Sequence, residues 1–228
     1  MATTFRKTVE EFTPPILFRA IAAILQRDPR SISDAARRSG QKGSDWYDQS
    51  FEDNEQSKWH YTKSSYYFLW SVIADRLVRV QARSVLDVGS GSGQLASLLK
   101  DKGIERYCGI DFSAKRIVQA KQACPEFDFV QADAFGTDLF ETYGYDAMVT
   151  TEFLEHVEGD LDIIFKIRSG ARFLGTVPNF PFESHVRHFR DANEVAARYG
   201  PYFKDFRVDS FLSNDKGKTF FVLEGIKT

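Results

Sequence analysis

The 228-residue sequence has few cysteines, no long apolar run and no excess of one charge. Cys108 and Cys124 are its only cysteines, which excludes a disulfide-rich scaffold, and we expect both thiols to stay reduced. No apolar run approaches the roughly 20 residues of a membrane helix, and the opening MATTFRKTVEEF lacks a signal-peptide core. These absences predict a soluble, cytoplasmic protein without a membrane span.

Charge and composition narrow the class further. The 30 basic and 32 acidic residues give a net charge of −2, so no strong basic field is available to attract nucleic acid. The sequence has no internal repeats. Its hydrophobic content of 43% is enough to fill the core of one large domain, alone or with an appendage.

The most informative stretch is SVLDVGSGSGQLASLL, residues 84–99. Its apolar run Val85–Val88 is typical of a buried parallel strand, and helical spacing of apolar residues resumes at Leu95. Between them, Gly89, Gly91 and Gly93 permit positive φ and a close approach of backbone to ligand. The pattern predicts a strand, a tight loop and a helix N-terminus that can receive a carboxylate or phosphate.

The loop has two candidate ligands. The dinucleotide fingerprint can be aligned on Gly91, Gly93 and Ala96, but Asp87 interrupts the strand and Gly89 already begins the turn. The Asp87 carboxylate would repel a pyrophosphate, whereas it could bind an ammonium group or hold the loop in shape. The residues therefore favour S-adenosylmethionine, which carries both a carboxylate and positive charge, over NAD.

The pattern at residues 85–93 resembles the first motif of class I S-adenosylmethionine-dependent methyltransferases, and later motifs follow in the family's order. A second strand, Tyr107–Ile110, ends at Asp111, where the family keeps its ribose-binding acid. A third strand in FDFVQADAF precedes Asp133, which in the family faces the adenine amino group beside an apolar neighbour, here Ala134. The resemblance covers roughly residues 84–179.

The resemblance implies a fold and a cofactor site. The fold is α/β, a Rossmann-like, mostly parallel seven-stranded sheet with helices on both faces and an antiparallel C-terminal hairpin, spanning residues 81–228. S-adenosylhomocysteine would be the product. The implied cofactor residues are the motif positions and their neighbours: Asp87, Gly89, Ser90, Gly91, Gly93, Gln94, Asp111, Phe112, Asp133, Ala134, Thr151 and Glu152.

Two segments precede this core. In residues 1–45, Pro14 and Pro15 open an amphipathic helical pattern that we expect to pack on the domain or on a partner subunit, as in a homodimer, before a polar linker. Residues 46–80 are rich in aromatic side chains, which suit either a lid or a helix packed on the sheet. We expect Tyr61 to close over the cofactor, and His60 and Tyr66 to contact the substrate.

The chemistry is expected after the fourth strand, Tyr145–Val149, because ligands bind at the carboxyl ends of parallel strands. His156 is the first candidate base for an acceptor hydroxyl, with Glu152 or Glu155 orienting it. Two alternatives stay open. In the first, the Glu-x-x-Glu-His pattern resembles the metal-binding pattern of small-RNA 2′-O-methyltransferases and ubiquinone-pathway O-methyltransferases. In the second, the Glu155–His156 pair only caps the next helix and bonds to backbone.

A second polar cluster follows the fifth strand, Phe173–Val177. His185, Arg187 and His188 are candidates for binding a polar acceptor, and either histidine could complete the divalent-metal site. The opening and the aromatic segment resemble methyltransferases of polysaccharide or natural-product pathways, which implies O-methylation of a glycan or small molecule. A metal-dependent RNA 2′-O-methyltransferase and a catalytically silent cofactor-binding protein are the alternatives.

Overall fold

The computed structural model describes residues 41–213 and 217–228. The amphipathic helix expected near Pro14 and most of the expected linker lie outside the described residues. The described chain begins with α4 (Ser44–Asp53), two short 3₁₀ turns (Glu55–Lys58 and Tyr61–Lys63) and α5 (Tyr67–Arg79). Everything after α5 belongs to an alternation of strands and helices.

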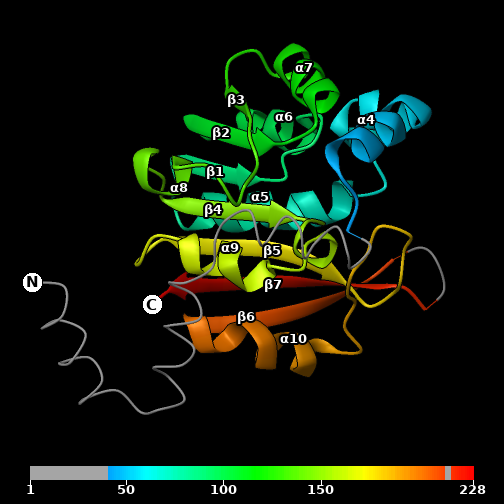
Figure 1. Ribbon diagram of the computed structural model, residues 1–228. Helices are drawn as coiled ribbons and strands as arrows, with labels where there is room; N and C mark the ends of the chain where they lie inside the picture. The colour runs from blue at the N-terminus through cyan, green and yellow to red at the C-terminus, as the bar shows by residue number, and fades with distance from the viewer. Residues whose placement is uncertain (1–40, 214–216) are drawn as a thin grey trace, which may run out of the picture.

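A single seven-stranded sheet forms the centre of the molecule (Figure 1). Its strand order is β3-β2-β1-β4-β5-β7-β6; β1 to β5 run parallel, and β7 pairs antiparallel with both β5 and β6. The expected Rossmann-like topology with an antiparallel C-terminal hairpin is confirmed. The strands are β1 (Ser84–Val88), β2 (Arg106–Asp111), β3 (Asp128–Gln131), β4 (Ala147–Thr151), β5 (Arg172–Pro178), β6 (Phe203–Leu212) and β7 (Thr219–Lys227).

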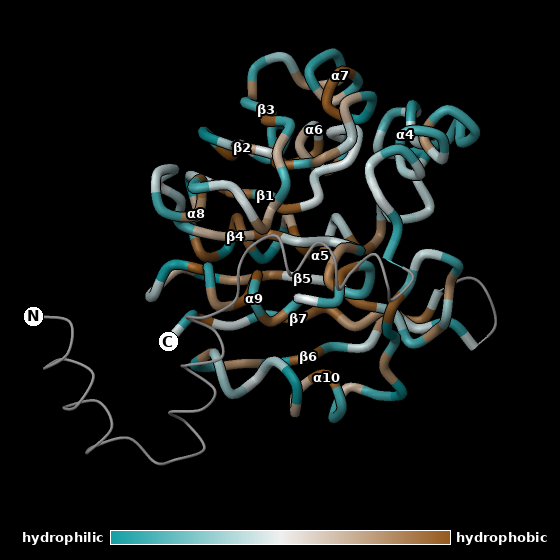
Figure 2. The backbone as a smooth tube through the Cα atoms, viewed as in Figure 1, coloured by the Kyte–Doolittle hydropathy of each residue, from teal (hydrophilic) through white to brown (hydrophobic). Residues whose placement is uncertain are grey.

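Helices cover both faces of the sheet because side chains alternate across each strand. Val85 of β1 joins one apolar cluster with α5, α6 (Gln94–Asp101) and α7 (Ala114–Ala123). Its neighbour Leu86 joins a second cluster with α8 (Leu139–Thr142), α9 (Asp160–Lys166) and α10 (Ala192–Tyr199). Figure 2 shows the result, with hydrophobic segments concentrated along the strands between the helices. The sheet is thus buried on both faces.

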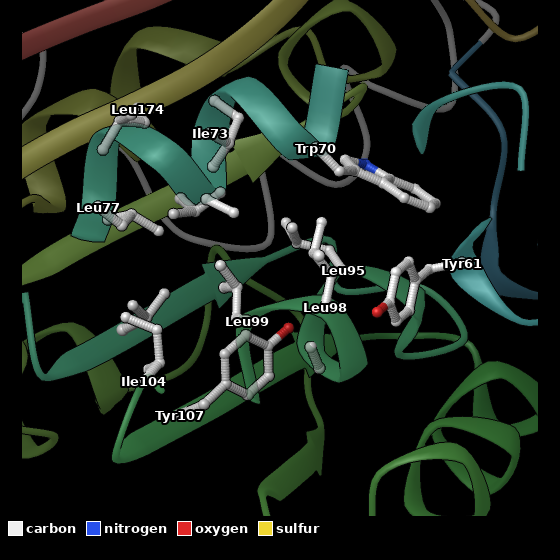
Figure 3. Close-up of a cluster of buried hydrophobic side chains, with 14 of the residues drawn as sticks. Tyr61, Trp70, Ile73, Leu77, Leu95, Leu98, Leu99, Ile104, Tyr107 and Leu174 are labelled. Carbon is white, nitrogen blue, oxygen red and sulfur yellow. The ribbon is translucent and has the colours of Figure 1, made fainter. Parts of the chain in front are cut away.

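The aromatic segment, residues 46–80, contains both a helix that packs on the sheet and a helix that packs elsewhere. In α5, Leu69, Ile73 and Leu77 are buried against the sheet, as expected for a packed helix. Figure 3 shows Tyr61 in the same cluster, beside Leu95 and Leu98 of α6. The first helix of the segment, α4, packs instead on α7, where Ser113 and the Lys115 amide donate to the Asp48 carboxylate. The segment is therefore divided, with α5 on one face of the sheet and α4 against α7.

One strand differs in position from its prediction. The fourth strand was predicted at Tyr145–Val149 but runs from Ala147 to Thr151. Tyr145 is buried before the strand, and its hydroxyl accepts a hydrogen bond from the Arg168 amide at 2.9 Å. The strand consequently extends to Thr151 and delivers Glu152 to the carboxyl edge of the sheet. Within the described part of the chain, no helix has the length and apolarity to cross a membrane.

Candidate active site

A pocket of about 330 Å³ opens at the carboxyl edge of β1, β2 and β4. This is the edge at which open α/β sheets bind ligands, and the volume is at the lower end of ligand pockets. Of the residues assigned to the cofactor from sequence, six line it: Gly89, Asp111, Phe112, Asp133, Ala134 and Glu152. His156, the candidate base, lines it too. The structure therefore brings three of the sequence motifs and the candidate base to one cavity.

The floor of the pocket is backbone. The amides of Gly89 and Ser90 both donate to the Ile110 carbonyl, at 2.8 and 3.0 Å, which ties the loop to the end of β2. Gly89 has φ +80°, and a Cβ there would lie 2.6 Å from a ring carbon of Phe153. Only glycine fits this position without strain. Gly93, also at φ +80°, begins α6 against the backbone of Ala120.

Two aspartates border the floor. The Asp111 carboxylate accepts from the Gly91 amide at 3.0 Å and from the Ser113 amide at 2.8 Å, one on each oxygen. Burial raises its pKa, and the charge of Arg116 is the largest opposing influence. Asp133 accepts from the Phe135 amide at 2.9 Å and remains exposed. Both aspartates keep lone pairs for hydroxyl or amino groups of a ligand.

Asp87 lies beneath the pocket instead of in its wall. It is 1% exposed, and one of its oxygens accepts the Tyr107 hydroxyl at 2.5 Å. Burial raises the pKa of Asp87 to about 7. In this position it joins β1 to β2 directly below the glycine loop. Ser90, Gly91, Gly93, Gln94 and Thr151 also lie outside the pocket lining.

Glu152 stands at the junction of β4 with the following turn. Its φ is +51°, an uncommon conformation for a residue with a side chain and a frequent feature of functional sites. The Thr176 hydroxyl fixes it twice, accepting from the Glu152 amide and donating to its carboxylate, both at 2.9 Å. Burial raises the pKa of Glu152 above its ordinary value.

Glu155, His156 and His185 form a cluster beside the pocket. One ligand atom from each lies within 4.8 Å of the other two. Glu155 is completely buried, and neither of its carboxylate oxygens has a hydrogen-bond partner among the described residues. Burial raises its pKa well above the ordinary value, and the charge of Glu152 raises it further. A buried carboxyl group without a partner is costly and points to a missing ligand.

The two histidine rings are held in a defined orientation. His156 Nδ1 lies 3.0 Å from the Ser184 carbonyl, and His185 Nδ1 lies 3.1 Å from the Phe180 carbonyl. Because a carbonyl can only accept, each Nδ1 carries the proton, which leaves each Nε2 lone pair free. Burial lowers the pKa of His156 to about 4, so its ring is neutral at pH 7. Its Nε2 lies 3.8 Å from a Glu155 oxygen.

Arg187, assigned to the acceptor from sequence, is occupied by the protein. Its guanidinium donates to the carbonyls of Leu154 at 2.6 Å and Glu158 at 3.0 Å, and also to that of Val157. It therefore braces the turn that carries Glu155 and His156. His188 is exposed and lies outside the pocket lining.

The aromatic segment was expected to contribute His60, Tyr61 and Tyr66 to the cofactor or substrate site, but none of the three lines the pocket. The Tyr61 hydroxyl donates to Asp101 at 2.6 Å, and the exposed His60 ring pairs with Thr62. Neither lines the pocket. Gln94 donates to the carbonyls of Gln56 and Trp59, which fastens the segment to α6. Tyr66 also lies outside the pocket lining, and its pKa is raised by burial and by the charges of Glu152 and Glu155.

Sequence reasoning missed one wall of the pocket. This wall consists of Gln41, Lys42, Gly43, Ser44 and Tyr47, and the lining is completed by Ile110, Arg116, Ala132, Phe135, Phe153 and Val157. Lys42 pairs with Glu183 at 3.2 Å, and the Glu158 amide donates to Gln41 at 3.0 Å. These contacts join residues more than 100 positions apart, so no local pattern indicates them. Tyr47 belongs to the aromatic segment, residues 46–80, but nothing in the sequence distinguishes it from the other aromatic residues there.

Comparison with known proteins agrees with this geometry. A sequence family described as methyltransferase domain matches residues 85–168, from β1 to just beyond α9. No protein with a curated description matches the sequence significantly.

Solved structures share the fold at low sequence identity. The methyltransferase domain of bacterial CtHen1-C is 19% identical, with a TM-score of 0.54 over 70% of this chain and 97% of that one. Magnesium protoporphyrin IX methyltransferase from Synechocystis, solved with bound S-adenosylmethionine, is 19% identical, with a TM-score of 0.54 over 72% of this chain and 80% of that one. The methyltransferase SibL, in its apo form, is 16% identical, with a TM-score of 0.57 over 71% of this chain and 55% of that one.

The strand order, the glycine loop and the family match together define the class. Residues 85–168 are similar to the methyltransferase domain family, and the chain has the Rossmann-like fold of methyltransferases that use S-adenosylmethionine. The pocket floored by Gly89 and bordered by Asp111 is accordingly its candidate cofactor site, and the Glu155–His156–His185 cluster (hereafter the carboxylate–histidine cluster) adjoins it.

Proposed function

We propose that this protein is a methyltransferase that transfers the methyl group of S-adenosylmethionine to a hydroxyl oxygen of a small molecule or glycan. The observation that carries the proposal is the neutral His156 ring, whose free Nε2 lies at the pocket wall, 3.8 Å from a buried Glu155 oxygen. A hydroxyl acceptor must lose its proton during transfer, and a neutral imidazole beside a carboxyl group can receive it.

The surroundings of the cluster suit a ring-shaped polar acceptor. The Phe182 side chain is 60% exposed, and its ring centroid lies 5.6 Å from that of His185. Tyr66 supplies a second aromatic ring, and its pKa is raised by burial and by the charges of Glu152 and Glu155. Aromatic faces beside hydrogen-bonding groups are a common way to hold a sugar or a phenolic ring.

Alignment of donor and acceptor supplies most of the rate. Methyl transfer from a sulfonium is an in-line displacement, and correct positioning contributes up to roughly 7–11 kcal/mol. The protein's own residues contribute by holding geometry: Thr176 fixes Glu152, and Arg187 braces the turn that carries Glu155 and His156. The proton leaves the acceptor toward His156 Nε2 as the methyl group arrives.

The test is methyl transfer to a panel of sugars, phenols and amines, followed by mass spectrometry of the products. We expect methylation on oxygen, and Glu155→Gln should lower kcat by roughly 10²–10⁴-fold. The exposed His188→Ala is the matched control and should retain full activity. Methylation confined to amines, or full activity in Glu155→Gln, would contradict the proposal.

A second candidate function is metal-assisted O-methylation, which extends to the 2′-hydroxyl of RNA. The observation that favours it is the donor set of the carboxylate–histidine cluster, one carboxyl group without a partner and two neutral imidazoles. These donors fit a divalent transition ion, since such ions prefer imidazole nitrogen and carboxylate oxygen. When bound, such an ion would polarise and acidify an acceptor hydroxyl.

Metal analysis separates the two candidates. If the ion is used, the purified protein should contain or take up about one equivalent of divalent metal, and His185→Ala should abolish this uptake. Chelation should then abolish methyl transfer, and re-addition of the ion should restore it. Full activity of a metal-free preparation would contradict the metal-assisted candidate and leave His156 acting alone.

A further inference from the structure

Arg116 is a pocket residue whose role the motifs do not explain. It lies in the first turn of α7 and lines the candidate cofactor site. Its Nε atom is buried and has no hydrogen-bond partner among the described residues. A buried guanidinium donor without a partner costs free energy, which a ligand can recover by accepting a hydrogen bond.

The orientation of the guanidinium is fixed from one side. Its central carbon lies 5.0 Å from the centroid of the Tyr47 ring, a cation–π contact with the wall residue of α4. Tyr47 in turn lies against Phe112, with ring centroids 5.3 Å apart. A planar group held against a ring retains only its edges for hydrogen bonding.

The positive charge of Arg116 influences the pKa values of two other residues in the pocket lining. It opposes the upward pKa shift that burial causes in Asp111, and it is likewise the largest opposing influence on the pKa of Tyr47. Arg116 and Asp111 line the same pocket, yet their side chains form no hydrogen bond or ion pair with each other. Both Asp111 oxygens already accept backbone amides, from Gly91 and Ser113.

We propose that Arg116 donates a hydrogen bond from Nε to a ribose hydroxyl oxygen of S-adenosylmethionine and determines, with Asp111, the recognition of the ribose diol. The proposal rests on the cofactor assignment and is independent of the acceptor. Asp111 offers only lone pairs and Arg116 only donors, so the two side chains complement the two hydroxyl groups, each of which can donate and accept. Arginine suits the position because lysine has no planar face to stack on Tyr47.

The decisive experiment is calorimetric titration of two ligands, S-adenosylhomocysteine and 5′-methylthioadenosine, which has the ribose but no amino-acid group. Arg116→Met keeps much of the side-chain length without the donors, and Arg116→Lys keeps the charge without the plane. Lys121→Met is the matched control, because Lys121 is an exposed cation on the same helix. Thermal unfolding of each variant verifies that it is folded.

We expect Arg116→Met to weaken both ligands equally, by roughly 10- to 100-fold, which corresponds to a lost hydrogen bond of a charged group. Arg116→Lys should weaken both by a smaller factor, and Lys121→Met should change neither. Unchanged affinity in Arg116→Met would overturn the proposal. Weakening of S-adenosylhomocysteine alone would also overturn it, because it would assign Arg116 to the amino-acid group. Failure of the wild-type protein to bind either ligand is a separate result that would overturn the cofactor assignment together with the proposal.

Discussion

The candidate site has a cofactor half formed mainly by backbone groups and a proposed acceptor half formed mainly by side chains. The cofactor half depends on backbone: the amides of Gly89 and Ser90 are fixed on Ile110, and the Gly91 amide is fixed on Asp111. The proposed acceptor half depends on side chains, namely the buried Glu155 and the half-buried His156 and His185 of the carboxylate–histidine cluster. Backbone geometry tolerates almost no change in residue size, whereas a side-chain cluster can be altered without unfolding the loop that carries it. Substitutions in the two halves should therefore fail in different ways.

The largest effect is expected at the glycine loop. Gly89→Ala combines φ +80° with a contact of 2.6 Å to Phe153, so it should weaken S-adenosylhomocysteine by roughly 100-fold, measured by calorimetry. Gly91→Ala is the matched control: φ is +56°, but nothing lies within 4 Å of its added Cβ, and the loss should be roughly tenfold at most. Equal losses in both variants would contradict the steric explanation.

The second largest effect is expected at Arg187, which holds the turn that carries Glu155 and His156. Arg187→Ala removes the donors that hold the carbonyls of Leu154, Val157 and Glu158, and should lower the free energy of unfolding by about 3 kcal/mol in urea titrations. It should also lower kcat, because the turn positions His156. If Arg187 instead bound the acceptor, KM would rise while stability stayed unchanged. His188→Ala, on the exposed neighbour, should change stability by less than about 0.5 kcal/mol.

A smaller effect, dependent on pH, is expected beneath the cofactor half. The pKa of Asp87 is about 7 in the folded protein against 3.8 ordinarily, so folding becomes less favourable as pH rises from about 4 to about 7. Asp87→Asn can still accept the Tyr107 hydroxyl but cannot ionise. The stability of Asp87→Asn relative to the wild type should therefore increase between pH 5 and pH 8 in urea titrations. A pH-independent difference would contradict the burial of an ionisable Asp87.

The smallest effect is expected at Tyr61. Its hydroxyl donates to Asp101, and its ring lies in the apolar cluster of α5 and α6 instead of the pocket. Tyr61→Phe keeps the ring, so the dissociation constant of S-adenosylhomocysteine should stay within about twofold of the wild-type value. A larger increase would restore Tyr61 to the cofactor site that the sequence first suggested.

The sequence predicts the cofactor half better than the acceptor half for a physical reason. Apolar runs and glycines are local signals, and they located β1 and the loop at Gly89 correctly. The roles of Arg187 and Gln94 depend on carbonyls 29 or more residues away, which no local pattern reveals. The pocket wall at Gln41–Tyr47 is held by contacts of the same long-range kind. Glu155 and His156 were found because their spacing of one residue keeps them together in any fold.

The central claim is that one edge of the sheet carries two separable sites, a backbone-floored site for the cofactor and a side-chain cluster for the acceptor. The most direct test is calorimetric titration of S-adenosylhomocysteine into the wild-type protein and into a Glu155→Gln, His185→Ala double variant. Both proteins should bind one equivalent with dissociation constants within about twofold of each other, although the double variant has lost methyl transfer. No binding by the wild type, or loss of affinity together with turnover in the variant, would contradict it.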